Sequence, residues 1–296
     1  MFNKEFISTK ENSKKTGRLY DGIFIPLEFE NIILRHVLLN NLKLEHYRCA
    51  PLLLLQGKKG EGKTFMTETV LRGNGIFYRI ISSSILAGNH ENDAVNILNL
   101  NYDACKMDPP NGRYSVLVID DFHLSIAVTR NSTTHTSNAE NLLAALMNIA
   151  DKKEGLKTPI ILIGNDFTDA YPPLTRFGRM NICTWAPSVT DKVEIIKEMI
   201  NQLPHDNACT TTDFIQNFIA RYKNQYIGFY EQAIQNVMLQ DFSKITEYFA
   251  SKKGKVNYLE LKRNTMEAIN KLTITTSALY EEADKLLSNK LEKLDK

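Results

Sequence analysis

The residues with the clearest chemical potential lie in one glycine-rich run, Gly57-Lys58-Lys59-Gly60-Glu61-Gly62-Lys63-Thr64, followed by Phe65. An apolar run at 52–56 precedes it and favours a strand, while the segment after it favours a helix. The glycines let backbone N–H groups surround phosphates at a helix N-terminus. Lys63 would neutralise phosphate charge and the Thr64 hydroxyl could ligate Mg²⁺. The run therefore predicts a site for a nucleoside triphosphate and Mg²⁺, rather than a chance glycine-rich turn.

Two aspartates lie at the end of a second apolar run, SVLVID at 115–120, and directly after it. Asp120 ends this run and would hold Mg²⁺ through water, while Asp121 lies where a glutamate often polarises the attacking water. Taken alone, two aspartates after a buried strand are an ordinary exposed turn. Their occurrence together with the glycine-rich run favours the functional interpretation.

Three polar side chains follow later apolar runs. Asn165 ends PIILIGN and could orient water beside the γ-phosphate if its strand lies next to the strand at 52–56; capping a turn is the alternative. Arg176 and Arg179 lie in PPLTRFGRM, and guanidinium groups suit γ-phosphate charge, including that of a neighbouring subunit. Two ordinary surface or salt-bridged arginines remain the alternative.

The elements that would position these residues alternate along the first two thirds of the chain. Short apolar runs are typical of buried strands, and the longer segments between them have helical period. This order predicts an α/β fold with a parallel sheet. The strand-like runs cover 52–56, 76–82, 115–120, 159–165 and 180–185.

Beyond Pro187 the pattern is helical, beginning with the capping-box spacing of Ser188 and Asp191. The last stretch carries a Leu and Ala stripe that we expect to dock on the other helices. The chain thus divides into a flexible polar tail at 1–19, an α/β domain at 20–187 and an α-helical region at 188–296. Candidate helices of that region cover about 190–203, 211–223, 228–241 and 257–272.

Composition narrows the functional classes. The 296 residues include 36 Lys and Arg and 34 Asp and Glu, which gives a formal net charge of +2. A net charge this small does not indicate a nucleic-acid or anionic-membrane partner. No apolar stretch approaches the ~20 residues of a membrane helix, and the N-terminus lacks the apolar core of a secretory signal, which predicts a cytoplasmic protein. The four cysteines form no C-x-x-C pair, which favours buried thiols over zinc or disulfides.

The order of these motifs resembles the AAA+ ATPases and, within them, the Rubisco activase family. The resemblance covers roughly residues 20–240 and includes LMNIAD, GNDF and LTRFGRM, which a generic phosphate-loop protein would not share. It implies a five-stranded parallel sheet with helices on both faces, followed by a helical lid. It also implies a homo-oligomeric ring, usually a hexamer, that uses ATP and Mg²⁺ to remodel a protein client, with Rubisco one possible client.

The family pattern gives every candidate residue a role. It makes Lys63 and Thr64 the Walker A pair, Asp120 and Asp121 the Walker B pair, Asn165 sensor 1, and Arg176 with Arg179 the trans-acting arginines. Residues 57–65 would bind ATP. Pore loops that engage the client would map onto 85–89 and about 131–137.

At one point the sequence departs from the family. Activases carry a sensor-2 arginine pair where this chain has Ile234 and Asn236. We therefore expect coupling between the lid and the phosphates to be weaker or supplied otherwise. Two alternatives stay open: a nucleic-acid-associated ATPase of loader or initiator type, suggested by scattered lysine pairs, and an ATP-binding scaffold with little hydrolysis.

Overall fold

The chain folds into two compact units in a computed structural model. The first contains the described residues up to Gly57 and from Lys63 to Trp185, and the second contains Lys58–Gly62 and the described residues from Ala186 onward. The two units are described separately below. The structure describes residues 16–42, 49–86, 93–107, 114–125, 137–151, 158–165, 172–239, 242–252, 257–269 and 273–294.

A five-stranded sheet with the order β4-β5-β6-β3-β7 forms the centre of the first unit. Every strand runs parallel to its neighbours, which confirms the predicted α/β fold. The Asn165-bearing strand lies beside the strand that leads into the glycine-rich run, as the proposed role of Asn165 requires. The strands are β3 (Leu52–Gln56), β4 (Phe77–Ser82), β5 (Ser115–Asp120), β6 (Ile160–Gly164) and β7 (Met180–Thr184).

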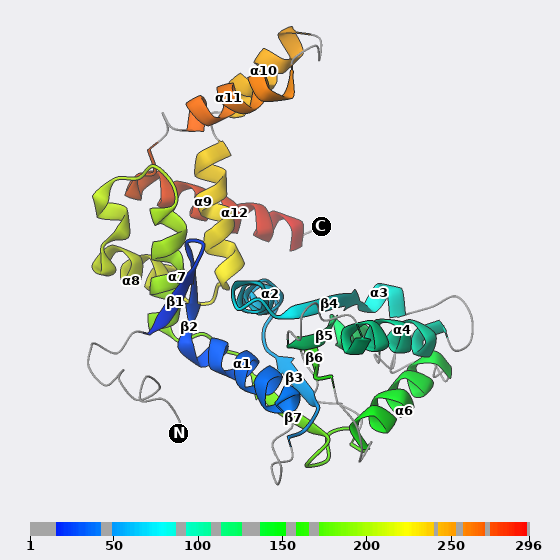
Figure 1. Cartoon of the computed structure of the whole chain (residues 1–296). Helices are drawn as coiled ribbons and strands as arrows, with labels where there is room; N and C mark the ends of the chain where they lie inside the picture. The colour runs from blue at the N-terminus through cyan, green and yellow to red at the C-terminus, as the bar shows by residue number, and fades with distance from the viewer. Residues whose placement is uncertain are drawn as a thin grey trace, which may run out of the picture. The chain divides into compact units, whose positions relative to one another are not determined.

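Both faces of the sheet are covered by helices (Figure 1). Successive strand residues point to opposite faces: Leu52 and Leu54 pack into one core, Leu53 and Leu55 into the other. The first core is completed by α4 (Asp93–Met107) and α6 (Ser137–Asp151), the second by α1 (Leu27–Asn41) and α2 (Lys63–Gly73). Burial on both faces explains why these strands are continuously apolar rather than alternating.

Residues 17–19, which the sequence assigned to a flexible tail over 1–19, belong to a strand. Strand β1 (Gly17–Tyr20) pairs antiparallel with β2 (Ile23–Pro26), and residues 1–15 lie outside the described part of the chain. The turn between them has positive φ at both Asp21 and Gly22, as two-residue hairpins favour. Tyr20 donates a hydrogen bond to Glu30 on α1, and Arg18 pairs with the same carboxylate. These contacts anchor a short segment whose own polar sequence suggested no structure.

The second unit is helical. Its α7 begins with the predicted capping box, in which Ser188 and Asp191 exchange hydrogen bonds. The C-terminal stripe docks as expected, because Leu279 and Ala283 are fully buried in the core of this unit. The helices are α7 (Val189–Asn201), η3 (Asn207–Thr210), α8 (Thr212–Arg221), α9 (Ile227–Leu239), α10 (Phe242–Ser251), α11 (Tyr258–Ile269) and α12 (Thr276–Leu294).

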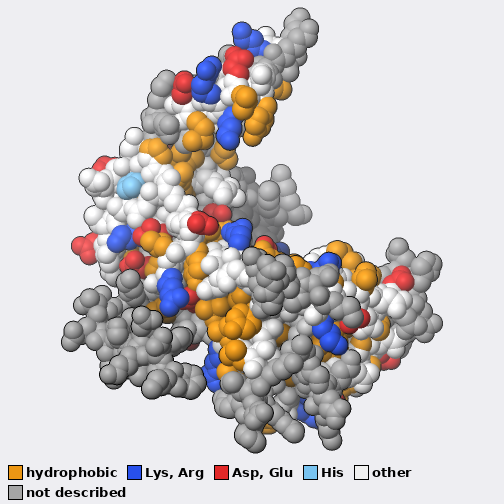
Figure 2. Space-filling model, in the orientation of Figure 1, with side chains coloured by type: hydrophobic (Ala, Val, Ile, Leu, Met, Phe, Trp, Pro, Cys, Tyr) orange, Lys and Arg blue, Asp and Glu red, His pale blue; other side chains and the backbone are white. Residues whose placement is uncertain are grey.

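The sequence did not predict α10, which is short and contacts α9 and α11. Hydrophobic and charged side chains are interspersed on the surface of α10 and α11 (Figure 2). Among the side chains that the structure describes there, the exposed large apolar residues are Phe249, Tyr258, Leu259 and Met266. Within the described part of the chain, no helix combines the length and apolar character that crossing a bilayer requires.

Candidate nucleotide-binding site

The candidate site of the first unit lies at one edge of its sheet. Because β5, β6 and β3 are parallel neighbours, the residues that end or follow them meet at their carboxyl ends. Asp120 ends β5, Asn165 follows β6 and Gly57 follows β3. This is the edge where open α/β sheets bind ligands.

Lys63 is the centre of this group of residues. It is the first residue of α2 and only 6% exposed. Its Nζ donates hydrogen bonds to the Gly57 carbonyl at 2.7 Å and to Oδ1 of Asn165 at 3.2 Å. The structure therefore brings the motif lysine and the candidate sensor residue into direct contact, which holds a buried cation at the carboxyl edge of the sheet.

Gly57 allows the chain to turn sharply after β3. Its φ of 155° lies in a region that side chains rarely adopt, and a Cβ there would come within 2.3 Å of the Trp185 carbonyl oxygen. The Trp185 N–H donates to the Gln56 carbonyl at 2.7 Å, so the end of β3 is held on that side. A glycine is therefore required at the first position of the motif.

Thr64 and Asp120 bring together oxygen atoms of the kind that could hold a magnesium ion. Thr64 Oγ1 donates to Asp120 Oδ1 at 2.9 Å, and the same oxygen accepts the Asp121 N–H at 2.9 Å. Mg²⁺ prefers hard oxygen ligands and is usually held by one or two protein oxygens together with water and substrate phosphates. The pair fits that requirement, whereas the described residues contain no cluster of three or more His, Cys, Asp or Glu able to hold a metal alone.

Asp121 differs from Asp120 in its surroundings. It is exposed and adopts a left-handed backbone with φ of 52°, an uncommon conformation for a residue with a side chain. The exposed position leaves its carboxylate accessible to solvent. His123, two residues later, lies 3.5 Å from Asn165, with its Nε2 facing the amide nitrogen. The sequence analysis missed His123, although it follows the candidate carboxylates closely.

The two candidate trans-acting arginines have different environments. Arg176 is exposed. Arg179 binds Asp151 through two parallel hydrogen bonds of 2.7 and 2.6 Å and donates a third to the Pro173 carbonyl. Asp151, at the end of α6, was not singled out from the sequence, because no local pattern links it to Arg179. Neither arginine makes a hydrogen bond to Lys63, Asn165 or Asp120 in the described structure.

The remaining motif residues differ in exposure. Lys58 and Lys59 are exposed, and Phe65 on α2 is 54% exposed. Glu61 is buried, and its carboxylate binds Lys192 of the second unit, to which residues 58–62 belong. The Glu61 side chain is thus engaged within the second unit. Only its backbone is therefore expected to contribute to nucleotide binding.

The pore-loop expectations are only partly described. Ile85 and Leu86 form part of the short helix α3 (Ser83–Leu86), and Leu86 is buried, so the expected exposed loop at 85–89 does not begin at Ile85. Leu86 packs in the core shared with α4 and α6, which gives it a structural role. Residues 87–89 and 131–136 lie outside the described residues.

The positions that correspond to the sensor-2 arginines carry no charge in this chain. Ile234 is buried in the core of the second unit, and the Asn236 side chain accepts a hydrogen bond from Gln232 on the same helix. Ile234 therefore stabilises α9 by packing, and another residue is needed for any polar link between this helix and the nucleotide.

Comparison with known proteins agrees with this geometry. Residues 53–188 match the family model described as ATPase family associated with various cellular activities (AAA). In sequence, residues 53–188 are therefore similar to an AAA ATPase domain. The matched region contains every candidate residue from Gly57 to Arg179 and all five strands except the first residue of β3.

The chain is also similar to Rubisco activases. It is 30% identical over 205 residues to ribulose bisphosphate carboxylase/oxygenase activase 2, chloroplastic, of Nicotiana tabacum, covering 65% of this chain and 47% of that protein. It is 28% identical over 277 residues to the ribulose bisphosphate carboxylase/oxygenase activase of Anabaena, covering 88% of this chain and 65% of that protein. The chain thus spans about half the length of the tobacco relative. These similarities confirm the resemblance drawn from the motifs.

Proposed function

We propose that this chain hydrolyses ATP with Mg²⁺ and uses the energy to remodel a protein client as a ring of identical subunits. One observation carries the catalytic part of the proposal: within an AAA ATPase domain, buried Lys63 contacts Asn165 while Thr64 contacts Asp120. A lysine, a hydroxyl, a carboxylate and an amide at the carboxyl edge of one sheet are the groups that phosphoryl transfer needs for charge neutralisation and positioning.

Each residue has a distinct role in this proposal. Lys63 neutralises phosphate charge, Thr64 and Asp120 hold Mg²⁺, and Asn165 orients the attacking water. Asp121 polarises that water. Arg176 and Arg179 act on the nucleotide of a neighbouring subunit, and of these two Arg176 is the better candidate because Asp151 already binds Arg179.

The client and the assembly rest on the relatives. Their names describe activases of ribulose bisphosphate carboxylase/oxygenase, so we propose Rubisco as the first client to test. The hexamer that the motif resemblance implies is the first assembly to test. We also propose that the protein works in the cytoplasm, where its four free cysteines would stay reduced.

The test of ATP hydrolysis is phosphate release by the purified chain, with Mg²⁺ and with EDTA, compared with Lys63→Ala. We expect turnover that requires Mg²⁺ and disappears in the variant, because the Lys63 charge would no longer offset that of the phosphates. Tight ATP binding without turnover by the unaltered chain would favour the scaffold instead. Turnover that depends on added DNA, with steep loss of DNA binding as salt rises, would favour the nucleic-acid-associated ATPase.

A further inference from the structure

The tip of the glycine-rich run packs with the helical second unit rather than with the sheet that flanks it in sequence. Residues 58–62 belong to the second unit, while Gly57 and Lys63 on either side belong to the first. Within the second unit, the tip meets two elements: α7 through Lys192, and the first turn of α9 through the backbone of Ile227 and Gly228.

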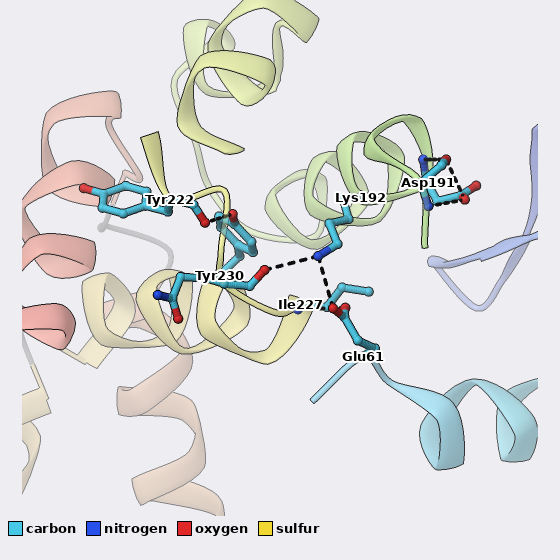
Figure 3. Close-up of polar contacts among 8 residues, drawn as sticks. Glu61, Asp191, Lys192, Tyr222, Ile227 and Tyr230 are labelled. Atoms are coloured by element: carbon cyan, nitrogen blue, oxygen red, sulfur yellow. Dashed lines mark hydrogen bonds and ion pairs between the residues drawn. The ribbon is translucent and has the colours of Figure 1, made fainter. Parts of the chain in front are cut away.

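Glu61 makes the central contacts, which Figure 3 shows. Its Oε1 accepts a hydrogen bond from Lys192 Nζ at 3.1 Å, and its Oε2 accepts one from the Ile227 N–H at 3.3 Å. Lys192 Nζ also donates to the Gln225 carbonyl at 3.1 Å. Both carboxylate oxygens of Glu61 are therefore used, and the ammonium group of Lys192 joins the loop tip to the segment that leads into α9.

This ion pair is shielded from water. The Glu61 side chain is 6% exposed and the Lys192 side chain 14%. Removal of one member of a buried pair leaves an uncompensated charge, so the two side chains depend on each other. An exposed pair would be screened by solvent and would carry little force between elements.

A backbone contact next to the ion pair fixes the loop further. The Gly228 N–H donates to the Gly60 carbonyl at 3.0 Å. Gly60 has φ of 82°, and a Cβ there would lie 2.2 Å from the Tyr226 ring, so the loop approaches the start of α9 more closely than any other residue type allows. The loop tip is thus held by three hydrogen bonds to α9 and α7, through Gly60 and Glu61.

The elements on the other side of these contacts are held by further hydrogen bonds. The capping box of Ser188 and Asp191 fixes the start of α7 immediately before Lys192, and Asp191 is drawn beside it in Figure 3. Tyr230, fully buried in the second turn of α9, donates its hydroxyl to the Tyr222 carbonyl at 2.9 Å. Burial, with a contribution from the Glu61 charge, raises the pKa of Tyr230 to about 12, so this donor stays protonated at neutral pH.

We propose that Glu61 is a positioning residue that couples nucleotide binding at the glycine-rich run to the helical second unit through Lys192 and the start of α9. The inference rests on the proposed function, since Gly60 and Glu61 lie within the run that would bind ATP. Nucleotide binding selects one backbone conformation of the run, and the Glu61 contacts select one too. Two sites that bias the same segment are coupled reciprocally. This chain lacks the family's sensor-2 arginines, so Glu61 supplies a link to the helical unit that those positions cannot.

The first experiment is a double-mutant cycle on the full chain with Glu61→Gln, Lys192→Met and the two combined. The readouts are the Kd of a fluorescent ATP analogue, and KM and kcat for ATP. We expect each single change to weaken nucleotide binding about tenfold, the double change to weaken it no further, and KM to move more than kcat. Lys192→Arg keeps the charge and should restore most of the affinity.

Lys197→Met is the matched control, because it removes a lysine from the same helix outside the Glu61 contacts and should leave Kd unchanged. Single changes that match this control, or effects that simply add in the double variant, would overturn the inference. If the unaltered chain neither binds nor hydrolyses ATP, the proposed function itself is wrong. These failures are therefore distinguishable.

If the variants do not fold, the coupling can be tested on the unaltered chain by hydrogen exchange. Hydrogen exchange at the Ile227 and Gly228 amides, which donate to the loop tip, should slow several-fold when the ATP analogue binds, whereas the Ile200 amide inside α7 should not respond. Unchanged exchange at both loop-facing amides, with the nucleotide bound, would contradict the proposed coupling.

Discussion

The Thr64 hydroxyl donates a hydrogen bond of 2.9 Å to Oδ1 of Asp120, although the two residues are 56 positions apart in the chain. The contact exists because α2 begins at Lys63, within the glycine-rich run, and β5 ends at the same edge of the sheet as β3 and β6. It places the Thr64 hydroxyl beside the Asp120 carboxylate at this edge of the sheet. The magnesium role proposed for this pair therefore rests on geometry as well as on residue type.

Asp120→Asn tests that role. The amide keeps the size of the side chain and can still accept the Thr64 hydroxyl, but it loses the negative charge that favours a divalent cation. We expect the Mg²⁺ concentration for half-maximal turnover to rise about 10–100-fold, the range for loss of a partner in a metal site. The measurement is an ATPase titration with Mg²⁺. An unchanged half-maximal concentration would remove Asp120 from the metal site.

Asp121→Asn tests the catalytic carboxylate and also identifies the client. The variant should bind ATP with unchanged affinity and lose about 10²–10⁴-fold in turnover, the usual contribution of a positioned acid or base.

Held in its ATP-bound state, the Asp121→Asn variant should retain the client from a native lysate, and mass spectrometry would identify that client. Lys63→Ala is the control bait, because it should not bind nucleotide. Rubisco recovered by Asp121→Asn alone would support the proposed client, whereas equal recovery by both baits would contradict ATP-dependent engagement.

The sheet, and the edge at which the candidate residues meet, could be predicted because their signals are local. Each core strand is a short apolar run, and burial on both faces makes such runs continuous. The glycine-rich run, Asp120 and Asn165 then follow three of these strands, and parallel neighbours bring those positions together. The hairpin at Gly17–Pro26 escaped prediction because its strands are four residues each and depend on contacts with Glu30.

The contacts that escaped prediction join residues far apart in sequence. Lys192 meets Glu61 across 131 positions, and Arg179 meets Asp151 across 28. No spacing in the sequence links the two members of either pair, so composition and periodicity contain no signal for these contacts. From the motif, Glu61 was expected to belong to the nucleotide site. The contact between its carboxylate and Lys192 is visible only in the folded second unit.

Arg176→Ala tests catalysis between subunits. The variant should bind ATP normally but lose ~10³-fold or more in turnover, since an arginine supplied in trans acts on transition-state charge. Arg72→Ala, a change at another exposed arginine, is the matched control and should keep full activity. Mixing Arg176→Ala with Lys63→Ala subunits should restore part of the turnover, because the latter still provide Arg176 to a neighbour. Full activity of Arg176→Ala would exclude it as the trans-acting residue.

His36 makes the first unit sensitive to acid. It is buried on α1, and its Nε2 donates to the Ile160 carbonyl at 3.2 Å, while Nδ1 has no hydrogen-bond partner among the described residues. Burial lowers the pKa of His36 from 6.5 to about 4. Above pH 7 the imidazole is neutral in both the folded and the unfolded chain. Below that, the unfolded chain gains the proton first, so stability falls until the folded protein also protonates near pH 4.

This linkage predicts that His36 alone costs about 2 kcal/mol of unfolding free energy between pH 7.5 and pH 5. Urea denaturation at both pH values measures it. His36→Gln can still donate to the Ile160 carbonyl but cannot titrate, so its loss of stability over that interval should be smaller by about 2 kcal/mol. His205→Gln removes a histidine from the second unit and serves as the matched control. Equal pH dependence of His36→Gln and the unaltered chain would show that His36 is not buried in its neutral form.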